Sequence, residues 1–228
     1  SYYIKNEFPT AICDNEIISA IDVTDFPSQY LVPEINSDVL EKRDFDNAGL
    51  DIGTSKTITD SMVTHLLFRT LDLDSWPLIV KYKPHCELII DDVSVSADPE
   101  FVIKIENSSL MVIESDKRKK ISKSNGFGEA QLAAEMLSLG DENNRLAEEH
   151  RNQTIFGVRI ISTYVTLYKT VISATYWEEL NRGLPDQSVV IKRWPGANGL
   201  RTGFNLAEPD GRQAVLTALV KIRQYLLQ

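Results

Sequence analysis

The chain has 228 residues, of which 43% are hydrophobic and 25% charged, and these are ordinary values for a globular protein of one or two domains. Its formal net charge of −9 disfavours nucleic-acid binding unless a local basic surface is present. The longest aliphatic run covers only 110–113, too short for a membrane-spanning helix. Two cysteines are too few for a disulfide framework or a structural zinc site, and the first residues lack a signal-peptide pattern. These features predict an intracellular protein that does not enter a membrane.

The N-terminal quarter differs in pattern from the rest of the chain. Residues 1–55 are acidic and interrupted by three prolines, which predicts an irregular arm packed on the main body. Apolar residues then recur at helical spacing and predict a helix over 57–70. Strand-forming runs follow at 78–80, 88–90, 101–105 and 110–113. The turn composition of 107–109 predicts that the last two strands form a hairpin.

The second half of the chain alternates in the same way. A second helix is predicted over 129–139, and the polar residues 140–153 fit either a helical extension or a surface insertion. Further strands are predicted at 154–161, 164–174 and 188–194, followed by a helix over 209–228. This order predicts an α/β (α+β) fold with a mixed central sheet flanked by helices. The predicted organisation is an arm of residues 1–55 and a domain of residues 56–228.

Three acidic residues lie where the two strands of the predicted hairpin begin and end. Asp98 precedes one strand and Glu114 closes the next, so an antiparallel hairpin brings them together. Asp116 shares a strand face with Glu114 because side chains alternate along a strand. Clustered carboxylates repel one another unless a divalent cation lies between them. The pattern predicts a Mg²⁺ or Mn²⁺ site that activates water and stabilises a phosphodiester transition state.

With these residues the sequence resembles the PD-(D/E)XK nuclease superfamily. Asp98, in Ala97-Asp98-Pro99, corresponds to the aspartate of the first half of the motif, and Glu114 to the acid of the second half. Gln131 lies where many nuclease members carry a glutamine. The stretch 157–169 is similar to later strands of Crinkler-type eukaryotic effector domains. Over residues 57–175 the resemblance implies a restriction-endonuclease-like core and a nuclease that uses Asp98, Glu114 and Asp116 as metal ligands.

One position departs from the family pattern. Asp116 stands where the family carries a lysine that orients the attacking water and stabilises charge. Lys117 could replace that lysine only if the strand ends or bulges at this point, since it otherwise points to the opposite face. The resemblance thus implies catalytic roles for Asp98, Glu114, Asp116, Lys117 and Gln131.

A basic run follows the last acid of the cluster and has three alternative interpretations. It can contact phosphates of DNA or RNA, form a solvated loop, or serve as a nuclear-import signal. The run comprises Lys117, Arg118, Lys119, Lys120 and Lys123.

Other features also leave alternatives open. An inactive nuclease fold that binds nucleic acid or a protein partner is one, and an interaction domain unrelated to nucleases is another. Asp60 is either a helix-capping acid or a helix-borne acid directed at the metal, and His65 is either a core-edge residue or a metal ligand. Aromatic residues in the second half could stack on bases or pack in the core, namely Tyr164, Tyr168, Trp177 and Trp194.

Overall fold

The computed structural model describes residues 56–90, 93–106, 108–116, 127–196 and 203–228. Its main sheet is mixed and has the strand order β1-β4-β5-β6-β7-β8, with β9 paired to β7. Only the β5–β6 pair is parallel; the other pairs are antiparallel. The strands are β1 (Leu78–Tyr82), β4 (Phe101–Ile105), β5 (Ser108–Asp116), β6 (Gln153–Ile161), β7 (Tyr164–Ile172), β8 (Ile191–Trp194) and β9 (Phe204–Asn205).

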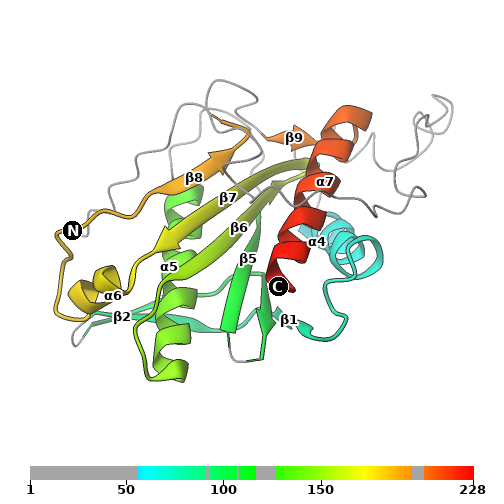
Figure 1. Cartoon of the computed structure of the whole chain (residues 1–228). Helices are drawn as coiled ribbons and strands as arrows, with labels where there is room; N and C mark the ends of the chain where they lie inside the picture. The colour runs from blue at the N-terminus through cyan, green and yellow to red at the C-terminus, as the bar shows by residue number, and fades with distance from the viewer. Residues whose placement is uncertain (1–55, 91–92, 107, 117–126, 197–202) are drawn as a thin grey trace, which may run out of the picture.

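Helices cover both faces of this sheet (Figure 1). Helix α5 (Phe127–Ala147) lies on one face and makes the connection between the parallel strands β5 and β6. Helix α4 (Lys56–His65), the π-helical turn η2 (Leu66–Thr70) and helix α7 (Pro209–Leu226) lie on the other face. The short helix α6 (Ala174–Leu180) follows β7. The predicted mixed sheet flanked by helices is therefore confirmed.

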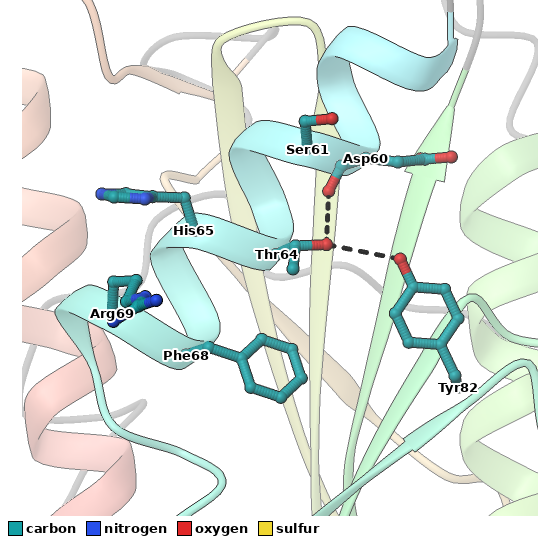
Figure 2. Close-up of a pocket in the computed structure, with 7 residues that line it drawn as sticks. All are labelled: Asp60, Ser61, Thr64, His65, Phe68, Arg69 and Tyr82. Carbon is teal, nitrogen blue, oxygen red and sulfur yellow. Dashed lines mark hydrogen bonds between the residues drawn. The ribbon is translucent and has the colours of Figure 1, made fainter.

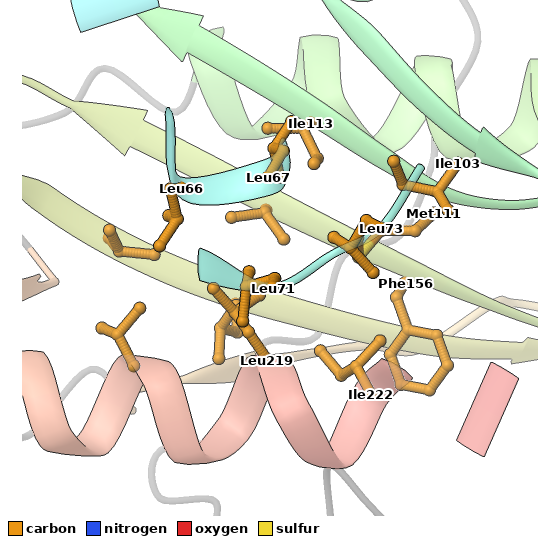
Figure 3. Close-up of a cluster of buried hydrophobic side chains, with 14 of the residues drawn as sticks. Leu66, Leu67, Leu71, Leu73, Ile103, Met111, Ile113, Phe156, Leu219 and Ile222 are labelled. Carbon is orange, nitrogen blue, oxygen red and sulfur yellow. The ribbon is translucent and has the colours of Figure 1, made fainter. Parts of the chain in front are cut away.

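The larger hydrophobic core fills the space between the sheet and the α4–α7 layer (Figure 3). Ile103, Met111, Ile113 and Phe156 project from β4, β5 and β6, and they are all fully buried. The π-helical turn, the residues that follow it and helix α7 complete the cluster with Leu66, Leu67, Leu71, Leu73, Leu219 and Ile222. Alternation along β5 then sends Val112 and Glu114 to the opposite face, toward α5.

A second core lies between α5 and the other face of the sheet. Val112, Leu132 and Met136 pack there together with the aromatic rings of Tyr168 and Trp177. The hairpin of β2 (Cys86–Ile90) and β3 (Val93–Ala97) adds buried side chains from β2, whereas β3 is exposed over most of its length. Since Tyr168 and Trp177 are each 1% exposed, they pack in the core and are not available to stack on bases.

Buried amides tie the C-terminal half of α5 to the starts of β5 and β6. The Asn143 Oδ1 atom accepts a hydrogen bond from the Ser109 backbone N–H at 2.6 Å. Its Nδ2 atom donates to the Ser109 carbonyl at 2.7 Å and to Gln153 Oε1 at 2.9 Å. Gln153 Nε2 donates to the Gly140 carbonyl at 2.9 Å and to Asn144 Oδ1. This neutral network fixes the helix to two strands at once, which is why residues 140–147 continue the helix instead of forming an insertion.

The sequence-based element boundaries agree with the structure in most places. The predicted helix 57–70 corresponds to α4 together with the π-helical turn. The predicted hairpin is present, with Phe101 opposite Ile113 and Val102 opposite Val112. Strand β3 and helix α6 were not expected. The predicted arm of residues 1–55 lies outside the described residues.

Candidate functional site

Two carboxylates and one amide meet where β5 ends and α5 begins. Glu114 is half-buried on the α5 side of β5. Gln131, on the first turns of α5, donates through Nε2 to Glu114 Oε1 at 3.2 Å and to Glu135 Oε1 at 2.9 Å. The i,i+4 spacing puts Gln131 and Glu135 on the same helix face, so one side chain can reach both acids. The glutamine thereby holds two like-charged groups side by side.

Glu135 is the more deeply placed of the two acids, since only 1% of it is exposed. Burial, and then the negative charges of Glu114 and Asp98, raise the pKa of Glu135 from 4.5 to about 7. Its Oε2 atom accepts no hydrogen bond from the described residues, while Gln131 donates to Oε1. A buried carboxyl group with one unsatisfied oxygen is costly in its charged form. The site therefore favours a proton or a cation at this position.

Asp98 lies in the connection between β3 and β4 and is exposed. Its Oδ1 atom is 2.8 Å from His85 Nδ1, and Glu87 Oε1 is 3.3 Å from the Nε2 atom of the same ring. These hydrogen bonds, with that of Asp98 the stronger, raise the pKa of His85 above its ordinary value. Asp98 is also close enough to act on Glu135 electrostatically. The predicted ligand is thus at the same edge of the sheet as Glu114, but a histidine engages it.

Glu100 is a buried acid that the sequence reasoning did not single out. It directly precedes Phe101, and the strand partner of Phe101, Ile113, directly precedes Glu114. Its side chain forms an ion pair with Lys83, with 3.7 Å between Nζ and Oε2. The sequence could have indicated this burial, because Glu100 lies two residues before Val102 and side chains two apart along an extended chain point to the same face.

Two buried arginines border the cluster on the β6–β8 side. Arg159 is paired with Glu114 in the parallel register of β5 and β6, and a Cβ atom on Gly128 would overlap its guanidinium group. Arg193 Nε lies 3.1 Å from Glu129 Oε1, which also accepts a hydrogen bond of 3.0 Å from the Tyr168 hydroxyl. The first turn of α5 therefore packs closely on the end of the Arg159 side chain at Gly128. The cluster therefore combines acids on β5 and α5 with two arginines on β6 and β8.

Asp60 reaches the candidate site from the opposite face of the sheet. Its Oδ1 atom accepts a hydrogen bond of 2.8 Å from the hydroxyl of Ser115, the residue between Glu114 and Asp116. Asp60 lies inside α4 and does not cap it, because the helix begins at Lys56. This contact holds β5 against α4 next to the acidic positions.

A pocket of about 540 Å³ opens beside Asp60 (Figure 2). Thr64 forms hydrogen bonds there with the Asp60 carbonyl at 2.7 Å and with the Tyr82 hydroxyl at 3.3 Å. His65 and Arg69 project from the other side of the helix in the same view. His65 contributes to the lining of this pocket and is exposed, so it does not pack at the edge of the core.

Two parts of the predicted site, the basic run and one acidic side chain, are not among the described residues. The basic run 117–123, including Lys117, and the side chain of Asp116 lie outside the described residues; the backbone of Asp116 pairs with Ile161 at the end of β5. Within the described part of the chain, no group of three His, Cys, Asp or Glu side chains is arranged to hold a metal ion. The two carboxylates Glu114 and Glu135 and the Gln131 amide are what the geometry brings together.

The sequence matches no protein-family model and no curated protein. Among the described helices, none is both long and apolar enough to span a membrane.

Proposed function

We propose that the chain is a metal-dependent nuclease-like domain that hydrolyses phosphodiester bonds in DNA or RNA. The observation that carries the proposal is the pairing of Glu114 and Glu135 through Gln131, at the edge of the sheet that Asp98 and Asp116 also reach. Such a set of oxygen donors suits Mg²⁺ or Mn²⁺, which carboxylates bind at ~2.0–2.6 Å. The order α4, β1, β4, β5, α5, β6 supports the resemblance to PD-(D/E)XK nucleases.

Each of these residues would have a role that follows from its position in the site. Asp98, Glu114 and Asp116 would hold the metal, which would activate water and stabilise negative charge on the phosphodiester. Gln131 would keep the Glu114 carboxylate oriented through its hydrogen bond. Glu135 would carry a proton near neutral pH, because its pKa of about 7 lies far above that of an ordinary glutamate. Lys117 would offset charge on the substrate.

A digestion assay tests this proposal. The full chain is incubated with plasmid DNA and with a structured RNA in Mn²⁺, in Mg²⁺ and in EDTA. We expect metal-dependent cleavage that Glu114→Ala abolishes, because removing a ligand leaves an incomplete coordination shell. Glu178→Ala is the matched control, since Glu178 is an exposed glutamate on α6 away from the cluster. Equal cleavage by parent and Glu114→Ala would overturn the proposed role.

Asp116 favours a second candidate function, an inactive nuclease fold that binds nucleic acid or protein. The family's catalytic lysine is missing at this position. This candidate predicts binding of DNA or RNA without cleavage in any metal.

The basic run tests nucleic-acid binding in either case. Neutralising three of its cations, Lys117, Lys119 and Lys120, should lower the log–log salt slope by about 2–3 if each contacts a phosphate. Fluorescence anisotropy at several salt concentrations measures that slope. An unchanged slope and affinity would assign the run to solvent and direct the search to protein partners.

A further inference from the structure

Side chains of β7, of β8 and of the residue before β8 form a surface on the sheet, which we call the Lys169 patch. It consists of Lys169, Val171, Val190 and Lys192. Lys169 and Lys192 are direct cross-strand partners, and each valine lies two residues from its lysine, on the same side of that pair. Val171 is 62% exposed and Val190 is 44% exposed. Since Leu167 belongs to the core beneath α7, alternation puts the patch on the α7 side of the sheet.

Among the described residues, the two lysines of the patch have no neutralising partner. Lys169 Nζ lies 5.6 Å from the ring centroid of Phe156 and 5.4 Å from that of Tyr225, so aromatic faces hold the cation in place. Burial and the nearby charge of Lys192 lower the pKa of Lys169. In the described part of the chain, neither lysine forms an ion pair. Like charges directly opposite one another destabilise an antiparallel strand pair, so an acidic group bound here would relieve that cost.

The chain carries a segment of matching chemistry. Residues 1–55 contain eleven Asp and Glu against three Lys and Arg, a net charge of −8, which leaves only −1 for residues 56–228. Apolar residues are interspersed with these acids, as in Ile12, Asp14, Glu16 and Ile17. An acidic segment with interspersed aliphatic side chains complements two lysines flanked by two exposed valines.

The segment is also long enough to reach the patch. Helix α4, which follows it directly, packs in the same core as α7, and the patch lies on that face of the sheet. Fifty-five residues extend to at most ~180 Å. A domain formed by residues 56–228 has a radius of gyration of only ~16 Å.

We propose that the acidic N-terminal segment, residues 1–55, binds the Lys169 patch of its own chain. Its carboxylates pair with Lys169 and Lys192, and its aliphatic side chains cover Val171 and Val190. This interaction is independent of metal binding at Glu114 and Glu135, because the Lys169 patch lies on the other face of the sheet.

Zero-length carboxyl–amine cross-linking of the full chain tests the proposal. Light and heavy isotope-labelled chains are mixed before cross-linking, and the linked peptides are identified by mass spectrometry. We expect links from Lys169 or Lys192 to acids between Glu7 and Asp51, within chains of one label. The absence of links from either lysine to residues 1–55 would overturn the proposal. Links found only between differently labelled chains would overturn it as well, and would assign the patch to a second copy.

Hydrogen exchange gives an independent readout. In Lys169→Gln/Lys192→Gln, at least one peptide within residues 1–55 should exchange about two- to thirtyfold faster than in the parent, the range expected for loss of two surface ion pairs. The control is Lys81→Gln/Lys104→Gln, which removes the same charge from β1 and β4. Unchanged exchange in β6 shows that the variant is folded. Equal exchange of residues 1–55 in parent and patch variant would contradict the proposal.

Discussion

The two ends of helix α5 hold polar side chains in opposite ways. At the C-terminal end, Asn143 and Gln153 use both the oxygen and the nitrogen of their amides, and the buried acid Asp141 is paired with Arg145. At the N-terminal end, Gln131 joins two acids, and one oxygen of buried Glu135 accepts no hydrogen bond from a described residue. Amide networks and paired charges stabilise a fold, whereas perturbed acids close to one another are typical of functional sites. The difference identifies the end of α5 where function is to be sought.

The largest expected change in stability is at the C-terminal end of α5, where the amide network lies. Asn143→Ala should lower the free energy of unfolding by about 3–5 kcal/mol, since it leaves the Ser109 N–H and carbonyl and the Gln153 amide oxygen buried without partners. Urea unfolding measures this loss. Asn181→Ala removes an exposed amide and should change stability by at most about 0.5 kcal/mol. A loss below about 1 kcal/mol for Asn143→Ala would show that this network is not what anchors the helix.

A substitution at the charged end should instead raise the free energy of unfolding, and only above acidic pH. The pKa of Glu135 is about 7 in the folded chain and 4.5 ordinarily, so the folded state binds the proton more tightly. Stability is therefore lost as the pH rises from about 4.5 through 7, by up to about 3 kcal/mol. Glu135→Gln should be more stable than the parent at pH 8 and equal to it near pH 4.

Unfolding of both proteins in EDTA across this pH range measures the difference. Comparison with the parent at each pH cancels the titration of other groups such as His85. A variant that is less stable than the parent at pH 8 would contradict the assigned burial of charge at Glu135.

Substitution of a glycine near each end of α5 should cause a smaller loss of stability, and the two losses can be compared. A Cβ atom on Gly140 would overlap the ring of Trp177, which is buried and cannot move away, so Gly140→Ala should destabilise by about 1–2 kcal/mol. At Gly128 the overlap is with the end of the Arg159 side chain, which can shift, so Gly128→Ala should cost less than about 1 kcal/mol. Thermal unfolding measures both. A larger loss at Gly128 would mean that Arg159 is held as rigidly as Trp177.

Periodicity was sufficient to predict the main helices, because α4 and α7 each bury one regular face, and continuous apolar runs predicted β4 and β5, which are buried on both faces. It could not predict β3, whose Val-Ser alternation is almost wholly exposed, or α6, which is only 7 residues long. For the site, the family resemblance implied a role for Gln131 beside Glu114, and the two side chains share a hydrogen bond. The i,i+4 spacing of Gln131 and Glu135 indicates by itself only a polar helix face. Its burial depends on how the sheet and the β2–β3 hairpin pack on α5, which local sequence does not encode.

The central claim is that the charged end of α5 binds a divalent cation through Glu114. Calorimetric titration of the full chain with Mn²⁺ at pH 8, in the absence of nucleic acid, tests it most directly. We expect saturable binding by the parent and by Glu178→Ala, and at least tenfold weaker binding by Glu114→Ala. Equal Mn²⁺ affinity in the parent and in Glu114→Ala would contradict the claim and leave the acids as surface features of an interaction domain.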